Sequence, residues 1–186
     1  MKSTRIAAAS VSLLLFAVAV SEAQEMPEMP SPQPEHQWLE RFVGEWRLEG
    51  KCSMGPDAPP MESKGTQRAR MLGGFWMVAE AKSSMMGMQF ESILTLGYDP
   101  KLGKYVGSWI DSVTDYMWHY EGSVSSDGNV LTLTTEGPNL VQPGSTANYR
   151  ETIEFKSDDQ YVFSSAIEGE NGEWQTMMTA NYYRTK

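Results

Sequence analysis

The sequence has little cysteine and little positive charge, and each shortage excludes a class of protein. Cys52 is the only cysteine among 186 residues, so no disulfide can form within the chain and its stability must come from packing. Lysine and arginine number 15 against 24 aspartate and glutamate residues, which gives a formal net charge of −9. Because so acidic a chain repels phosphate backbones, we expect no nucleic-acid partner.

The sequence also lacks the short motifs of common active sites. It contains no Gly-x-Ser-x-Gly, no His-Glu-x-x-His and no glycine-rich phosphate loop before a helix. Of its two histidines, we expect His36 to precede a short helix and His119 to point outward, so neither supplies a haem ligand inside the protein. Met178 could replace histidine in that role, but nothing singles it out. We therefore expect no cofactor.

The sequence has one long apolar run, at its N-terminus. Lys2 and Arg5 precede the apolar residues 6–20, and Ser21 and Ala23 place small residues at the −3 and −1 positions of a cleavage site. This arrangement is typical of a secretory signal peptide over residues 1–23. The run is shorter than the roughly 20 residues of a membrane-spanning helix. We expect a periplasmic or secreted protein without stable membrane insertion.

A proline-rich segment and a short helix follow the predicted signal peptide. Residues 24–34 contain four prolines, which favour an extended linker. The apolar residues that come next are spaced as one stripe of a short helix that Gly44 can end: Trp38, Leu39, Phe42 and Val43. We expect this helix to plug or flank a single β-barrel domain over residues 35–186.

From residue 45 onward the hydrophobic period is two, and turn-forming residues recur about every eight to twelve residues. This pattern is typical of an all-β sandwich or barrel. Short connections such as Gly73-Gly74 and Asn171-Gly172 favour antiparallel neighbours. The ten predicted strands cover residues 45–54, 65–72, 75–84, 90–98, 104–111, 116–124, 129–137, 146–156, 160–169 and 173–184.

A meander of ten strands exposes two edges unless its first and last strands pair. We therefore predict an all-β fold, a closed antiparallel up-and-down barrel of calycin-like type, with an interior able to hold one ligand. A β-sandwich is the first alternative. The second is an outer-membrane barrel with apolar side chains toward lipid, against which the short loops and the polar C-terminus count.

Side-chain parity assigns the two faces of the strands. Trp46 and Leu48 alternate with Arg47 and Glu49, so one face is apolar and the other solvated. Cys52 has the parity of the apolar residues. We therefore expect a buried, inert thiol.

Several strings in this order resemble an uncharacterised bacterial family known only as a domain of unknown function: GEWRLEG (44–50), LTLGYDP (94–100), YVGSWID (105–111), YEGSVSSDGNVLTLTTEGP (120–138) and YRETIEFKSDD (149–159). The resemblance spans about residues 35–185. It implies no activity, because the family has none established. The family often carries a histidine where Asn181 stands here, so any ligand role of that histidine is missing.

A looser likeness to lipocalins and other calycins rests on two elements. Those barrels begin with Gly-x-Trp on the first strand and carry a basic residue on the last, as Gly44-Glu45-Trp46 and Arg184 do here. A guanidinium that stacks on an indole stabilises the closed end of such a barrel by roughly 0.5–2 kcal/mol. The likeness predicts that Trp46 and Arg184 lie together.

Three further patterns are compatible with a metal site, an acid–base residue or a copper site. Asp111, Asp115 and His119 would align as metal ligands only on a helix, whereas the surrounding sequence favours strands. Glu80 would serve as an acid or base if it faced the interior, and otherwise marks a solvated face. Methionines could bind copper in two segments, Met26-x-x-Met29 and Met85-Met86-Gly87-Met88, although methionine also fills apolar pockets.

We expect the barrel to bind a small apolar or amphipathic molecule, because the predicted interior is rich in aromatic residues and methionine. The predicted ligand-binding residues are Trp46, Trp109, Trp118, Tyr120, Met178 and Arg184. Two other classes of function are alternatives to ligand binding. One is a small hydrolase or isomerase with a carboxylate in the interior, and the other is a structural or interaction module whose interior is packed solid.

Overall fold

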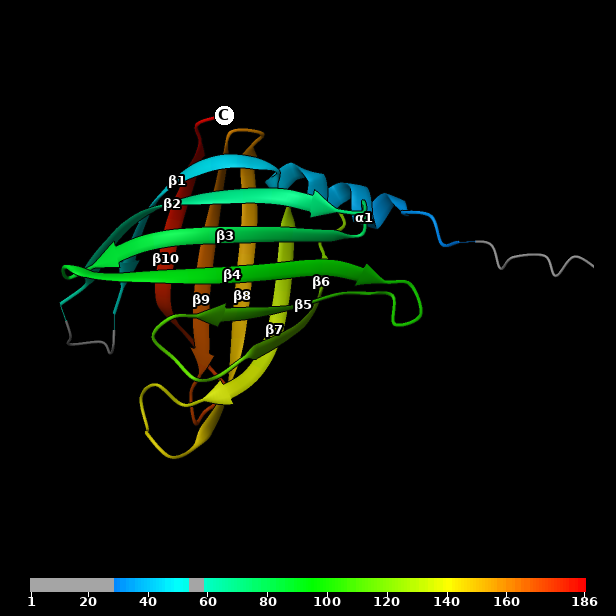
Figure 1. The fold of residues 1–186 in the computed structure, drawn as a ribbon. Helices are drawn as coiled ribbons and strands as arrows, with labels where there is room; N and C mark the ends of the chain where they lie inside the picture. Colours follow the sequence, from blue (N-terminus) through cyan, green and yellow to red (C-terminus); the bar gives the residue numbers. More distant parts are fainter. Residues whose placement is uncertain (1–28, 54–58) are drawn as a thin grey trace, which may run out of the picture. The chain divides into compact units, whose positions relative to one another are not determined.

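Strands form where apolar and polar residues alternate, and turn-forming residues separate them. The computed structural model describes residues 29–53 and 59–186, and residues 32–186 form one unit. The predicted signal peptide therefore lies outside the described residues. The elements in chain order are α1 (Pro34–Trp38), the 3-10 helix η1 (Leu39–Phe42), β1 (Gly44–Cys52), β2 (Met61–Leu72), β3 (Trp76–Met85), β4 (Met88–Asp99), β5 (Lys104–Asp111), β6 (Trp118–Val124), β7 (Val130–Pro138), β8 (Thr146–Ser157), β9 (Gln160–Glu168) and β10 (Trp174–Arg184) (Figure 1).

The ten strands form a closed barrel in which each strand pairs antiparallel with its neighbours in sequence. β1 and β10 close the barrel, with Trp46 opposite Arg184 and Cys52 opposite Met178. The predicted up-and-down barrel is thus confirmed, and the sandwich alternative is wrong. Closure pairs both edge strands, so the barrel presents no open edge.

Turns form where the sequence predicts them. Gly73 and Gly74 connect β2 to β3 with φ values of 63° and 76°, a left-handed conformation that glycine adopts without steric cost. Met86 has φ 52° and Gly87 has φ 81° in the turn between β3 and β4. That turn holds Met86 outside the barrel, with 79% of its surface exposed.

The two short helices cover one end of the barrel, which we call the helical end. Trp38 Nε1 and Arg41 Nη1 both donate to the Gly128 carbonyl between β6 and β7, at 2.8 and 2.7 Å. Leu39 and Phe42 are at most 1% exposed. The expected helical segment, which we call the plug, is therefore confirmed, but it forms as α1 followed by η1 rather than as one helix, and Val43 of the predicted apolar stripe follows η1 and is 36% exposed. We call the opposite end, formed by the connections β3–β4, β5–β6, β7–β8 and β9–β10, the far end.

The prediction that His36 precedes the helix is wrong. α1 begins at Pro34, because proline is favoured in a first helical turn, and His36 lies within it at 3% exposure. Its Nδ1 accepts a hydrogen bond from the Gln33 N–H at 3.0 Å, and its ring meets the rings of Phe75 and Tyr98 at centroid distances of 5.2 and 5.8 Å. His36 therefore helps to fasten the plug.

Candidate ligand-binding interior

The helical half of the barrel interior is packed with aromatic side chains. Trp46 is 1% exposed, and its Nε1 donates to the Phe42 carbonyl at 2.7 Å. Tyr161 stacks on Tyr182 with a centroid distance of 4.3 Å and an interplanar angle of 13°. The Gln67 amide donates to the Tyr161 hydroxyl at 2.8 Å. These contacts pack the helical half of the interior.

Arg184 belongs to the same packed half. Its Cζ lies 4.1 Å from the centroid of the Trp46 ring, and its guanidinium donates to the carbonyls of Arg41 and Val43. Its Nε also donates to the Asp158 carbonyl at 2.9 Å. The structure thus gives Trp46 and Arg184 a packing role, since they join the last strand to the plug and to β1.

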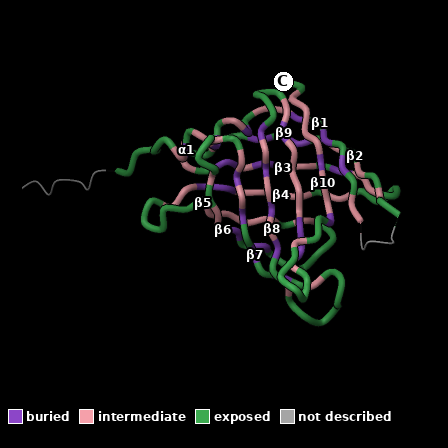
Figure 2. The backbone as a smooth tube through the Cα atoms, turned by 180° about the vertical axis from the view of Figure 1, so that it is seen from behind, coloured by how far each residue is buried: buried purple, intermediate pink, exposed green. Residues whose placement is uncertain are grey.

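Some inward-facing side chains are less covered than the buried core. Cross-strand register places Leu94 opposite Trp109 on β4 and β5, and Ile153 opposite Phe163 on β8 and β9. Leu94, Trp109 and Phe163 are half-buried, whereas Leu131 and Leu133 on the same inner wall have at most 1% exposure. Along the strands, buried and half-buried positions alternate with exposed ones (Figure 2). Because a closed barrel hides its inner wall from the outside, the exposed surface of these side chains faces the interior of the barrel.

Three of the predicted binding residues lie on neighbouring positions of this inner wall. Trp109 pairs with Trp118 across β5 and β6, and Tyr120 follows two residues later on the same face. Trp118 meets Tyr149 edge to face at a centroid distance of 4.9 Å. Its indole Nε1 is buried and has no hydrogen-bond partner, which leaves one unsatisfied donor in the wall.

The sequence analysis missed a carboxyl group in the same wall, Glu151 on β8. Register places Glu151 between Leu133 on β7 and Ser165 on β9. Only 6% of Glu151 is exposed, and the Ser165 hydroxyl donates to its Oε1 at 3.0 Å. Its Oε2 is buried and has no partner. Burial raises the pKa of Glu151 to about 8, so the carboxyl is mostly neutral at pH 7.

A signal for Glu151 was present in the sequence. It has the same parity as Tyr149, Ile153 and Phe155, so an acidic residue occupies an apolar position of an alternating strand. Parity shows that such a residue points inward. It cannot show which strands face it, because the neighbours of β8 are fixed only when the sheet closes.

Among the described residues, no basic group compensates Glu151. The inward-facing positions of the described strands carry no lysine, and Arg41 and Arg184 lie against Phe155 and Trp46 at the helical end. The second inward-facing acid, Asp111, accepts hydrogen bonds from the N–H groups of the turn that follows β5. The described inner wall of the far half thus combines apolar side chains, two acids and hydroxyl groups such as those of Ser83 and Ser165, and it carries no cation.

Met178 lies on the inner wall beside the lone thiol. It pairs with Cys52, which also pairs with Met61, so three sulfur-bearing side chains share one face of β10, β1 and β2. Cys52 is half-buried, so the expectation of a fully buried thiol is wrong, and its partial burial raises the pKa of the thiol. Of the methionines proposed for copper, Met88 is 56% exposed beside the exposed Met86, and Met26 lies outside the described residues.

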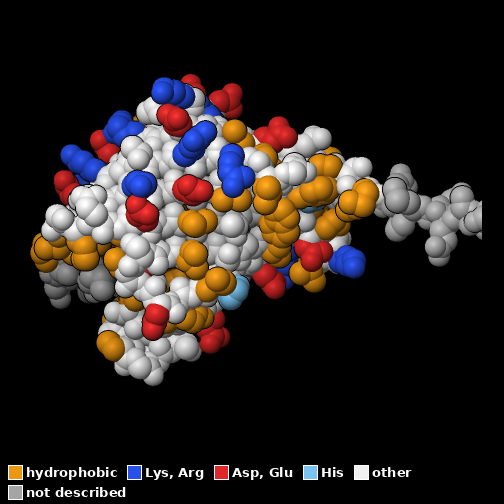
Figure 3. Space-filling view, viewed as in Figure 1, with side chains coloured by type: hydrophobic (Ala, Val, Ile, Leu, Met, Phe, Trp, Pro, Cys, Tyr) orange, Lys and Arg blue, Asp and Glu red, His pale blue; other side chains and the backbone are white. Residues whose placement is uncertain are grey.

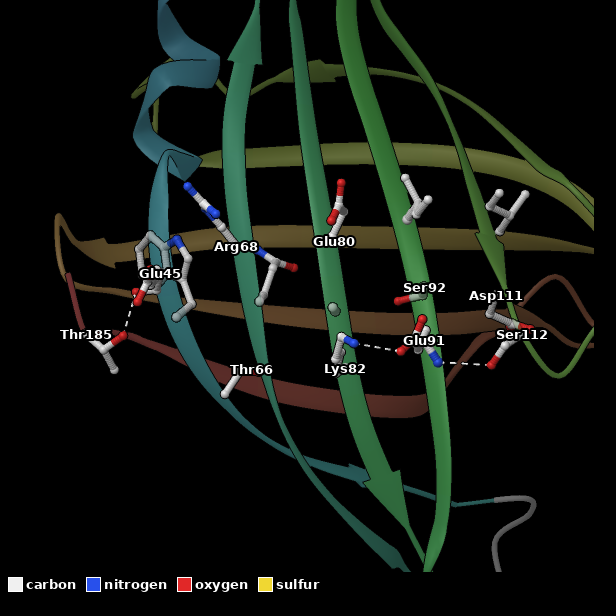
Figure 4. A pocket seen from close by; sticks show the side chains of 15 residues that line it. Glu45, Thr66, Arg68, Glu80, Lys82, Glu91, Ser92, Asp111, Ser112 and Thr185 are labelled. Atoms are coloured by element: carbon white, nitrogen blue, oxygen red, sulfur yellow. Dashed lines mark hydrogen bonds and ion pairs between the residues drawn. The ribbon is translucent and has the colours of Figure 1, made fainter.

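Glu80 faces outward. It lies in a groove of about 620 Å³ across the outer face of β1 to β5, where Lys82 pairs with Glu91 at 2.8 Å (Figure 4). Acidic and basic side chains are intermixed over this face (Figure 3). The groove is therefore the solvated side of the sheet, and Glu80 does not supply the interior carboxylate that an enzyme would need.

The aspartates and the histidine at four-residue spacing do not come together. Asp111 faces inward, whereas Asp115 and His119 are exposed. Within residues 29–53 and 59–186, no three side chains of His, Cys, Asp or Glu gather as a metal site.

No helix in the described part of the chain is both long and apolar enough to span a bilayer.

Comparison with known sequences identifies the family. A family model described as "Protein of unknown function (DUF1579)" matches residues 31–184. The chain belongs to this family. The match covers the span of the strings noted in the sequence, so that resemblance is confirmed. No curated protein sequence matches this DUF1579 chain.

Among solved structures, the DUF1579 barrel is similar to Rv2717c from M. tuberculosis, with a TM-score of 0.60, 15% identity and coverage of 84% of this chain and 100% of that one. A redesigned β-barrel, mFAP0, bound to DFHBI has a TM-score of 0.41 at 12% identity, with coverage of 77% and 99%. A fluorescence-activating β-barrel designed de novo has a TM-score of 0.42 at 15% identity, with coverage of 79% and 96%. The first likeness supports the fold alone, and the two weaker ones carry no argument.

The inner wall offers both an acid with a raised pKa and unpaired hydrogen-bonding groups. A carboxyl with a raised pKa can act as a general acid, but in the described part of the chain Glu151 has only the Ser165 hydroxyl as a hydrogen-bond partner. Acid–base chemistry usually pairs such a group with a second titratable side chain or an activated nucleophile. The unsatisfied Oε2 of Glu151 and Nε1 of Trp118 instead offer hydrogen bonds to a bound molecule.

Proposed function

We propose that the far half of the barrel binds a small amphipathic molecule, which enters at the far end and lies along the inner wall. One observation carries this proposal: inward-facing Leu94, Trp109 and Phe163 are half-buried, although the barrel is closed and its helical half is packed. A wall of aromatic and aliphatic groups with a few polar atoms is the usual lining of a small-molecule site.

The proposal assigns different roles to the predicted binding residues. Trp109, Trp118, Tyr120 and Met178 lie on the inner wall of the far half and would contact the ligand. Trp46 and Arg184 support the closed helical half. Export from the cytoplasm, as the N-terminal sequence predicts, would place the protein where it can take up molecules from outside the cell.

Titration with a neutral single-chain alcohol tests the proposal without involving charge. We expect decan-1-ol, added below its solubility limit, to change tryptophan fluorescence and raise the melting temperature. A small ligand that gains about 0.5 kcal/mol per non-hydrogen atom would bind with a Kd of roughly tens to hundreds of micromolar. Unchanged fluorescence and melting temperature would favour a structural module.

A further inference from the structure

We infer that the ligand carries a positively charged amine group, which pairs with Glu151 inside the barrel. This inference rests on the proposed function and specifies its ligand class. It starts from Oε2 of Glu151, which is buried without a partner in a wall that has no lysine and no free arginine among the described residues. The wall itself supplies one hydrogen bond, from Ser165 to the other oxygen.

The neighbours of Glu151 favour a cation over an anion. Tyr120 and Tyr149 lie close enough for Glu151 to add to the rise in their pKa values, which burial mainly causes, so both phenols stay neutral. Trp118 packs against Tyr149 at the same place. Aromatic faces around a carboxylate are the chemistry that recognises ammonium groups. A fatty acid would instead bring its negative charge into a wall that already holds Asp111, and it would form no ion pair with Glu151.

Pairing also explains how the carboxyl becomes charged. Without a ligand, burial keeps Glu151 protonated, and its Oε2 is covered by surrounding side chains. An arriving ammonium group stabilises the carboxylate, so Glu151 gives up its proton to solvent and the two opposite charges pair. Uptake requires the covering side chains to rotate, and the new ion pair compensates for that rotation. The unsatisfied Trp118 Nε1 can donate to a ligand oxygen or to water that accompanies the ligand.

Three decyl compounds with the same chain separate this inference from the proposed function. At pH 7, decylamine is a cation, decan-1-ol is neutral and decanoate is an anion. We expect decylamine to bind at least about tenfold more tightly than decan-1-ol, and decanoate to bind most weakly. Calorimetry in two buffers of different ionisation enthalpy should show nearly one proton released per decylamine bound, and none for decan-1-ol.

Glu151→Gln is the decisive variant, since glutamine keeps the size and removes the titration. The preference for decylamine over decan-1-ol should fall to within about twofold, and proton release should disappear, whereas decan-1-ol binding persists. Glu154→Gln is the matched control, because Glu154 lies on the same strand, half-exposed, and pairs with Lys156. It should behave as the unaltered protein does.

The outcomes separate the two claims. If decan-1-ol binds but decylamine is not preferred, or if the preference survives in Glu151→Gln, the inference is wrong and the proposed function stands. If none of the three compounds binds to the full chain, the proposed function itself is wrong.

Discussion

Arg184 stacks on Trp46 across the strand pair that closes the barrel, with the guanidinium carbon 4.1 Å from the ring centroid. The same guanidinium donates to backbone carbonyls of η1 and of the residue that follows it, so one side chain connects the last strand, the first strand and the plug. The Arg184–Trp46 contact thus covers the packed half of the interior at the helical end.

Trp46→Ala should destabilise the protein strongly. The ring is 1% exposed, so its removal leaves a large cavity and should cost roughly 3–5 kcal/mol in the free energy of unfolding. Arg184→Ala should cost less, because part of the lost stacking and hydrogen bonding is replaced by water. Urea denaturation monitored by circular dichroism measures both. Equal stability of Trp46→Ala and the unaltered protein would contradict the packing described for the helical half.

Glu151 should make stability fall as pH rises. Its pKa is about 8 in the folded protein and about 4.3 in an unfolded chain. Between these values the folded state holds a proton that the unfolded state has lost, so the free energy of unfolding decreases from about pH 4.3 to pH 8 and then levels off. The total decrease in the free energy of unfolding over this pH range is of the order of a few kcal/mol.

Glu151→Gln tests this directly, because it removes that slope. Its stability should exceed that of the unaltered protein by an amount that grows between pH 5 and pH 8, as urea denaturation at several pH values would show. Glu154→Gln, whose carboxyl is half-exposed, should follow the unaltered protein closely. A difference that shrinks with rising pH would show that Glu151 is ionised in the folded protein.

Gly137→Ala should displace Trp118 without altering any polar group. A methyl group at Gly137 would lie 2.4 Å from the Trp118 ring, which is only 8% exposed and has little room to move. We expect a loss of about 1–3 kcal/mol in stability and an altered tryptophan emission. Gly169→Ala, where the nearest atom is at 3.4 Å, is the control and should be nearly neutral.

Replacing Trp109 should weaken ligand binding more than replacing Trp174. Trp109 lies on the inner wall, whereas Trp174 pairs with Glu168 on the outer face and contacts the Arg150 guanidinium at 4.5 Å. For decan-1-ol we expect a loss of about tenfold, or 1.4 kcal/mol, in Trp109→Ala and less than twofold in Trp174→Ala. Equal losses in fluorescence or calorimetric titrations would place the ligand outside the barrel.

The fold could be predicted from the sequence because its signals are local. Alternation shows that Trp46 and Leu48 face inward, glycine pairs such as Gly73-Gly74 mark the turns, and the need to pair two edges indicates closure. The contact between Trp46 and Arg184 followed from closure combined with the likeness to calycins. Alternation and turns depend on residues near one another in the sequence. Closure depends on one requirement of the whole sheet, that its two edge strands pair.

The candidate site could be predicted only in part. Parity placed Trp109, Trp118 and Tyr120 on one face of their strands, but not how far solvent reaches them. Glu151 was missed because its chemistry comes from burial by strands distant in sequence, which raises its pKa and leaves Oε2 unsatisfied. Neither property belongs to the residue until the barrel has formed.

Methionine-methyl NMR of the full chain tests the central claim most directly, since methionines lie in each region. Met61 and Met178 lie on the inner wall of the far half, Met77 is fully buried nearer the helical end, and Met29, which precedes α1, is 82% exposed. Addition of decan-1-ol should shift the methyl signals of Met61 and Met178 saturably and leave those of Met77 and Met29 unchanged. Unchanged signals of Met61 and Met178 would contradict a ligand site inside the barrel.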